Sequence, residues 1–141
     1  MIIVTRLMAV MMGLFCFSVS AQETFLGHLS FKNDSLLIQY QFSSSPVAGK
    51  KLTMALQTID AKTNQSIDIN DNIKVVLWMP SMGHGSSPTQ VEHAVDANGS
   101  AITGAYSVKN VYFVMPGEWE VRVILTDAQG TQETKSFNIA L

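Results

Sequence analysis

The sequence predicts an all-β protein, an immunoglobulin-like antiparallel β-sandwich of about seven to nine short strands. Apolar residues recur mostly at every second position, which is the pattern of a strand with one buried face. Turn-forming residues interrupt these runs every eight to twelve positions, as the connections of a sandwich do. No stretch after Gln22 shows the periodicity of an amphipathic helix, so we expect no helix there.

The first half of the sandwich is predicted to hold three strands. Asn33 and Asp34 separate the first two, because both residues favour turns. A loop that carries Pro46 precedes the third strand, and its apolar residues alternate with polar ones. The three strands are predicted at residues 25–31, 36–42 and 52–59.

The next predicted strand, residues 73–79, has few polar residues on either face. A strand that is apolar on both faces is typical of the centre of a sheet. Its apolar positions Ile73, Val75, Leu77 and Met79 alternate with Lys74, Val76 and Trp78.

Two hairpins are expected to follow. The first joins strands 90–95 and 101–108 through an Asn-Gly pair at 98–99, which favours a tight turn. The second joins strands 111–115 and 119–125 through Pro116-Gly117, which fits a type II turn. After a turn at 127–130, a last strand at 137–141 is expected to close the sheet.

The first twenty-one residues have the organisation of a secretory signal peptide. Arg6 supplies the positive charge, residues 7–19 are apolar, and Val19-Ser20-Ala21 is a small-residue cleavage site. We therefore predict a signal peptide over 1–21, one domain over 22–141, and a periplasmic or secreted location. The alternative is an uncleaved anchor, because residues 2–21 approach the length that spans a bilayer.

Cys16 is the only cysteine, and the large residues Leu14 and Phe15 before it do not fit a lipidation site. Without residues 1–21 the chain therefore has no thiol, and a metal site would have to use His, Met, carboxylate or backbone groups.

The chain after residue 21 is mildly acidic. Without Arg6 it holds eight basic and eleven acidic residues, a net charge of -3 with His neutral. Neither sign clusters, so no basic stripe indicates a nucleic-acid surface, and no apolar run there could span a membrane. No nucleophile elbow, phosphate loop or His-Glu-x-x-His motif occurs, so we predict a protein that is not an enzyme.

Two thioethers and one imidazole lie close together in the segment 78–88, which is rich in Gly, Pro and Ser. Met79, Met82 and His84 fall within six residues of one another. Thioether sulfur suits Cu(I), and imidazole suits copper more generally. We therefore predict a copper site, with Cu(I) favoured, at these three residues.

The backbone of this segment would allow the three side chains to converge. Pro80 should end the strand near Met79, because proline cannot donate a hydrogen bond to the sheet. Gly83 and Gly85 accept turns that other residues resist, so the loop is expected to fold back over the end of the strand.

Two motifs resemble the YtkA-like and FixH-like domains: Met-Pro-Ser-Met-Gly-His-Gly at 79–85 and Met-Pro-Gly-Glu-Trp at 115–119. Those families are small exported β-sandwich domains, often associated with copper handling and the assembly of copper-containing respiratory oxidases. The resemblance covers about 73–125 and implies that Met115 begins the family's Pro-Gly turn and Trp119 is its core tryptophan. FixH-like proteins retain an N-terminal membrane helix, whereas the cleavage pattern here favours a free periplasmic domain.

Two further residues could complete the metal site. A short return at 86–89 would place strand 90–95 beside 73–79 and bring His93 near the loop. Met115 would meet Met79 if their strands end at the same edge of the sandwich.

Each candidate also has an ordinary structural interpretation. Met79 and Met115 would then be core residues, Met82 an exposed loop residue, His84 a surface histidine and His93 a half-buried, hydrogen-bonded one. Trp78 and Trp119 are expected to pack, although a tryptophan beside a Cu(I)–thioether site would shield it from solvent.

Two functions remain open on the sequence. One is a copper-binding or copper-delivery domain, linked to cuproenzyme or respiratory oxidase assembly, whose partner is a copper acceptor. The other is a non-metal interaction module of the cell envelope, in which the Met- and Gly-rich loop is an adaptable contact surface for a protein partner.

Overall fold

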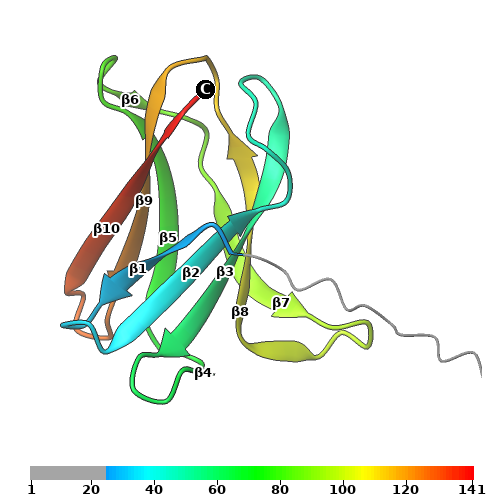
Figure 1. Cartoon of the computed structure of the whole chain (residues 1–141), viewed down its shortest axis with the longest axis vertical. Coiled ribbons are helices and arrows are strands. Elements are labelled where there is room, and N and C mark those ends of the chain that lie inside the picture. Colours follow the sequence, from blue (N-terminus) through cyan, green and yellow to red (C-terminus); the bar gives the residue numbers. More distant parts are fainter. Residues whose placement is uncertain (1–24) are drawn as a thin grey trace, which may run out of the picture.

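Two antiparallel sheets packed face to face make up the computed structural model, which describes residues 25–141 (Figure 1). The six-stranded sheet has the order β1-β2-β3-β8-β7, with β4 paired to β3, and the four-stranded sheet has the order β10-β9-β5-β6. The predicted all-β sandwich is confirmed, and no helix occurs between residues 25 and 141. The strands are β1 (Gly27–Phe31), β2 (Leu36–Phe42), β3 (Lys51–Asp60), β4 (Gln65–Ser66), β5 (Asn72–Met79), β6 (His84–Gly85), β7 (Gln90–Val95), β8 (Ala101–Tyr112), β9 (Glu118–Thr126) and β10 (Gln132–Ala140).

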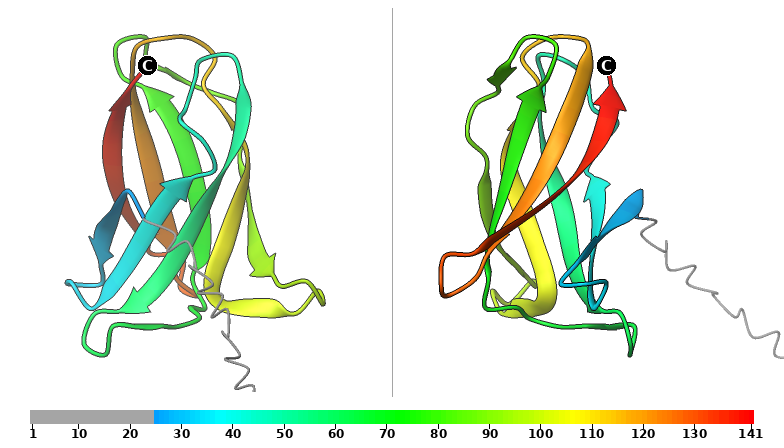
Figure 2. Two further views of the ribbon diagram at one scale, coloured as in Figure 1. Left: turned by 45° about the vertical axis from the view of Figure 1, so that its right-hand side comes forward. Right: turned by 90° about the vertical axis from the view of Figure 1, so that its left-hand side faces the viewer.

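The hydrophobic core lies between the sheets, and both views in Figure 2 show the strands running along the long axis around it. Alternate residues of β5 and β9 point inward, as the period-two pattern predicts. Burying one such side chain is worth roughly 1.5–3 kcal/mol. The largest fully buried side chains are Trp119, Phe31, Phe113, Ile38, Met54, Leu56, Leu77 and Leu125.

One end of the sandwich, here called the rim, is formed by three connections. These are the hairpin turn 80–83, the segment 113–117 that passes from β8 to β9, and the loop 43–50 between β2 and β3 (Figure 1). Backbone hydrogen bonds hold two of them: Gly49 of the loop 43–50 donates to the Phe113 carbonyl at 2.8 Å, and Gly117 and Leu141 exchange bonds of 2.9 and 3.0 Å. The segment 113–117 is therefore fixed both to the loop 43–50 and to Leu141.

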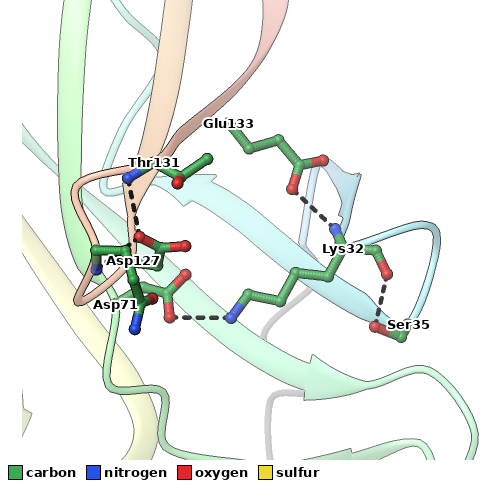
Figure 3. A network of polar contacts seen from close by, with 7 residues as sticks. Lys32, Ser35, Asp71, Asp127, Thr131 and Glu133 are labelled. Carbon is green, nitrogen blue, oxygen red and sulfur yellow. Dashed lines mark hydrogen bonds and ion pairs between the residues drawn. The ribbon is translucent and has the colours of Figure 1, made fainter.

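At the opposite end, here called the base, Lys32 joins the two sheets (Figure 3). Its ammonium donates to Asp71 Oδ1 at 2.9 Å, and its backbone N–H donates to Glu133 Oε2 at 3.0 Å. Lys32 lies in the turn between β1 and β2, whereas Asp71 precedes β5 and Glu133 belongs to β10. Lys32, Asn33 and Asp34 have φ values of 52°, 54° and 65°, a left-handed turn that Asn and Asp tolerate better than most residues.

The predicted hairpin at 96–99 is confirmed, because β7 pairs with β8 across it. Asp96 Oδ1 accepts hydrogen bonds from the backbone N–H of Asn98 at 2.8 Å and of Ser100 at 3.0 Å, and Gly99 has a φ of 80°. Asp127 builds the turn between β9 and β10 with the same side-chain pattern. An aspartate at the first turn position therefore fixes both turns.

The predicted hairpin between 111–115 and 119–125 is wrong. β8 ends at Tyr112 and pairs with β3 and β7, whereas β9 pairs with β5 and β10 in the other sheet. The segment 113–117 crosses between the sheets. Strands on either side of such a crossover bury their side chains in the same core, so the apolar alternation does not distinguish it from a hairpin.

Two strand boundaries also differ from the prediction. β8 is one strand across the expected break at 109–110, where a bulge places Asn110 at a φ of 59°. β10 begins at Gln132 rather than 137. The prediction placed its start too late because the first residues of the strand are polar and show no apolar alternation. It is an edge strand, and such a strand does not need a continuous apolar face.

The predicted signal peptide at 1–21 lies outside the described residues. Between 25 and 141, no helix long and apolar enough to cross a membrane occurs.

Candidate metal site at the rim

The segment that carries the candidate ligands forms a tight β-hairpin. Met79, the last residue of β5, pairs with His84, the first residue of β6. The Met79 carbonyl accepts the N–H of Met82 at 3.2 Å and of Gly83 at 3.0 Å, and Gly83 has a φ of 64°. This is a four-residue loop built on a type I turn and closed by a left-handed glycine. The expectation that the loop folds back over the strand end is wrong, because the turn instead continues the sheet outward.

Met79 occupies the inner face of the smaller sheet. Its side chain is only 2% exposed and belongs to the hydrophobic core. A Cβ placed on Gly117 would lie 2.8 Å from the Met79 methyl group, so the segment 113–117 passes directly over the thioether. The sequence left a core residue and a ligand as alternatives for Met79, and the structure gives it a core environment at the edge of the rim.

His84 lies beside Met79 on the same face, because directly paired residues of antiparallel strands share a face with Cβ atoms about 4.5–5.5 Å apart. The imidazole is half-buried, and its Nδ1 lies 3.2 Å from the Gly85 carbonyl oxygen. A carbonyl can only accept, so in the tautomer that makes this hydrogen bond the proton is on Nδ1 and the Nε2 lone pair is free. In that tautomer His84 would present one nitrogen to a ligand, as metal-binding histidines usually do.

Trp119 fills the space between the hairpin and the segment 113–117. Its ring centroid is 6.4 Å from that of His84 and 5.4 Å from that of Phe113, both in edge-to-face arrangements. Its Nε1–H donates to the Met115 carbonyl at 2.9 Å. Extending the β5–β9 register by one residue beyond Trp78 places Met79 opposite Trp119. The His84 ring and the Met115 carbonyl thus both adjoin the Trp119 indole, and Met79 lies opposite Trp119 in register.

Met115 is half-buried and packs against the core from the segment 113–117. It lies in the same part of the rim as Met79, because Gly117, two residues further on, covers the Met79 methyl group. The condition that the sequence set for Met115, a shared edge of the sandwich, is therefore met.

Met82 differs from the other candidates because it is exposed. It lies within the turn, and 59% of its surface is accessible. The structure thus brings Met79, His84 and Met115 together at the inner edge of the rim and leaves Met82 on its outer surface.

His93 does not join this group. β7 pairs with β8 in the larger sheet rather than with β5, and the expectation that it would bring His93 near the loop is wrong. His93 stacks on Tyr106 with ring centroids 4.5 Å apart, and its Nε2 lies 3.5 Å from Asp68 Oδ1. The chain leaves β6 after Gly85, passes the edge of β5 and enters the larger sheet at Gln90. β7 then runs toward the base, which carries His93 away from the rim (Figure 2).

The outer face of the hairpin has a different chemistry. Arg122 lies 5.0 Å from the Trp78 ring and donates to Glu120 Oε2 at 3.0 Å. This hydrogen bond holds the pKa of Glu120 below its ordinary value and raises the pKa of Arg122. The two tryptophans thus face opposite sides of the smaller sheet, Trp78 toward charged side chains and Trp119 toward the candidate ligands.

Within residues 25–141, no three His, Cys, Asp or Glu side chains gather into a group that could hold a metal ion. That donor set leaves out methionine, which supplies three of the four candidates at the rim. The candidate site is therefore a thioether–imidazole site.

A family model described as YtkA-like matches residues 33–124. The chain belongs to the YtkA-like family. The match is wider than the two motifs at 79–85 and 115–119, and it includes every candidate ligand of this YtkA-like domain. No curated protein and no solved structure matches the chain.

Sequence reasoning did not identify two features of the YtkA-like rim. One is Gly117, whose lack of a side chain makes room for the Met79 methyl group. The other is the contact of Trp119 with both His84 and Met115. The sequence shows that Met115 and Trp119 are four residues apart. It does not show that the indole bonds to the Met115 carbonyl, because this contact depends on the crossover of 113–117 between the sheets.

Proposed function

We propose that this YtkA-like domain binds Cu(I) at the rim and delivers it to a copper-requiring protein. The observation that carries the proposal is the Met79–His84 pair, in which a thioether and an imidazole extend from directly paired residues, with the segment that holds Met115 passing over the Met79 methyl group. Soft thioether and borderline imidazole donors suit Cu(I) better than any hard cation.

The donor set suits delivery as well as binding. Thioethers are neutral, so Cu(I) binds to them and leaves them without gain or loss of a proton. An imidazole must be neutral to bind, so it strengthens the site and makes it weaken as the solution is acidified. A site with one imidazole and several thioethers would hold copper firmly enough to carry it and still release it to an acceptor with stronger ligands.

Met82 has a separate place in this proposal. Because its side chain is 59% exposed at the tip of the hairpin, it is the candidate thioether that an incoming ion or an acceptor protein reaches first. Met82 would pass copper to His84, two residues along the chain, and Met79 and Met115 would complete the coordination from inside.

We further propose that the domain acts in the periplasm or outside the cell after removal of residues 1–21, with a copper acceptor as its partner. The support for this is the cleavage pattern at Val19-Ser20-Ala21.

Anaerobic titration with Cu(I) against a chromophoric chelator tests the proposal. The domain should bind Cu(I) stoichiometrically, and His84→Ala and Met82→Ala should each weaken binding by at least about tenfold, or 1.4 kcal/mol. His28→Ala is the control, because His28 is exposed on β1 in the larger sheet. Parent-like affinity in both rim variants would place copper elsewhere.

A second function, a protein-interaction module without metal, has one observation in its favour. Val47, Met82 and Val114 are exposed apolar side chains, and each lies on a different connection of the rim. Exposed apolar surface in one place is typical of a contact surface. If the domain binds no Cu(I), and Val114→Glu abolishes a physiological complex that Ile102→Glu leaves intact, this function is the correct one. Ile102 is the matched control, since it is 44% exposed against 39% for Val114 and lies at the base.

A further inference from the structure

Trp119 is almost completely buried, at 1% exposure, yet it contacts two separate parts of the rim. Its ring meets His84 of the hairpin edge to face, with centroids 6.4 Å apart. Its Nε1–H donates to the carbonyl of Met115 in the crossover segment. The indole therefore links the segments that carry the proposed imidazole and thioether ligands.

We propose that Trp119 is the inner wall of the copper site, positioning Met115 and His84 and giving the site its preference for Cu(I) over Cu(II). This inference rests on the proposed function, because it concerns the same site. It assigns Trp119 a role that packing alone does not require.

That Trp119 positions Met115 follows from the hydrogen bond between its indole N–H and the Met115 carbonyl. Because the Trp119 side chain is buried, its indole N–H cannot donate to water instead. Breaking the bond to the Met115 carbonyl would therefore leave a buried donor without an acceptor, which is unfavourable. The same bond fixes the backbone of Met115, and with it the point from which the thioether extends. Phenylalanine at 119 would keep most of the ring packing and lose this bond.

The preference of the site for Cu(I) over Cu(II) follows from solvation and from the type of donor atom. Cu(II) favours tetragonal sites of nitrogen and oxygen donors, commonly with water, whereas thioethers select Cu(I). The ring of Trp119, which is buried and packs edge to face on Phe113 at 5.4 Å, borders the site with apolar surface that excludes water. Desolvating a doubly charged ion costs more than desolvating a singly charged one, so this wall penalises Cu(II) more. An indole face also attracts a cation without donating a hard ligand.

Trp78 is the matched control, because it is the neighbouring residue of Met79 in β5 and faces the opposite side of the sheet. Its ring lies 5.0 Å from the Arg122 guanidinium carbon, on the outer face. Trp78→Phe removes the outer indole and leaves Trp119 as the fluorescent residue, and Trp119→Phe does the reverse.

The experiment titrates Cu(I) and, separately, Cu(II) into the parent domain, Trp78→Phe and Trp119→Phe, following tryptophan emission and chelator competition together. In Trp78→Phe, stoichiometric Cu(I) should quench the emission of Trp119 and bind with parent affinity. In Trp119→Phe, Cu(I) affinity should fall about tenfold, the emission of Trp78 should barely change, and the ratio of Cu(I) to Cu(II) affinity should fall.

Unfolding midpoints in urea separate these effects from loss of structure. If Trp119→Phe does not fold, the emission of Trp78→Phe decides alone, because that variant keeps the native Trp119. Cu(I) bound tightly with no change in Trp119 emission overturns the inference and leaves the proposed function standing. Absence of Cu(I) binding by the parent overturns the proposed function, and the inference with it.

Discussion

Met79, Met82 and His84 lie within six residues of sequence, yet their side chains meet three different environments. Met79 is in the core, His84 is half-buried beside it, and Met82 is exposed. The sequence predicted the three donors but not this division, because burial depends on where the hairpin turns. The turn is set by the carbonyl of Met79 and the left-handed backbone of Gly83.

This division predicts different costs for the same substitution. Met79→Ala should destabilise the domain by about 2–5 kcal/mol, because it leaves a cavity in the core. Met82→Ala should change the free energy of unfolding by less than about 0.5 kcal/mol, as is usual for an exposed residue. Urea unfolding of the metal-free protein measures both. Equal effects of the two substitutions would contradict the assigned environments.

Asp60 predicts a dependence of stability on pH. Its Oδ1 accepts the backbone N–H of Lys62 at 2.8 Å and of Thr63 at 3.0 Å, and the bonds to Thr63 and Lys62 hold the pKa of Asp60 below its ordinary value of 3.8. A carboxyl with a lowered folded pKa adds stability above its unfolded pKa and loses it as the pH falls through the folded pKa.

The parent domain should therefore lose more stability than Asp60→Asn between neutral pH and the acid side of 3.8. Urea unfolding at a series of pH values gives the difference. Parallel curves for the two proteins would show that the two backbone hydrogen bonds do not favour the charged carboxylate.

At the level of strands, the sequence predicted which segments are extended better than it predicted how they pair. β2, β3, β5 and β9 lie close to their predicted positions, because each carries a regular apolar alternation. The segment 113–117 is a crossover although the sequence predicts a hairpin there, since Pro116-Gly117 satisfies the local rules for a tight turn. The position predicted for His93 was also wrong, because the irregular stretch after Gly85 changes sheet without any local signal.

Gly104 in β8 shows how closely the elements fit at one point. Its φ is 67°, and an added Cβ would lie 2.8 Å from the Thr58 carbonyl oxygen and 2.9 Å from that of Ile67. Its N–H donates to Asp68 Oδ1 at 2.7 Å, which holds the segment before β5 against the larger sheet. These contacts are with backbone atoms, which cannot move aside as a flexible side chain can.

We therefore expect Gly104→Ala to cost several kcal/mol, since a left-handed non-glycine residue alone costs about 1–2 kcal/mol. Gly99→Ala is the control, because Gly99 also has a positive φ of 80° but nothing lies within 4 Å of an added Cβ. The difference between the two unfolding free energies isolates the steric contribution. A difference near zero would mean that β3 and β8 are less closely packed than described.

The whole molecule gathers its aspartates at one end. All six aspartates lie in the turns and strand ends of the base: Asp34, Asp60, Asp68, Asp71, Asp96 and Asp127. The rim carries exposed Val47, Met82 and Val114 and the proposed thioether ligands. Aspartate is favoured in the turns of the base because its carboxylate bonds to the backbone of the turn. Since the aspartates lie at the base, the rim has few hard oxygen ligands.

Export of the domain is a prediction about the whole chain. If residues 1–21 are removed, mass spectrometry of protein from the periplasm or medium should find Gln22, or its cyclised form, at the N-terminus. The control is the same protein with Ala21→Arg, which should remain uncleaved because the site needs a small residue. A full-length parent protein held in the membrane fraction would favour the anchored alternative.

Copper K-edge X-ray absorption of the Cu(I)-loaded domain shows which atoms hold the metal. A site at the rim predicts a first shell of sulfur with one imidazole, and the imidazole scattering should vanish in His84→Ala and persist in His93→Ala. His93 is the control because it lies in the other sheet, beside Asp68 and Tyr106. A first shell of nitrogen and oxygen alone, or imidazole scattering that survives His84→Ala, would contradict a thioether–imidazole site at the rim.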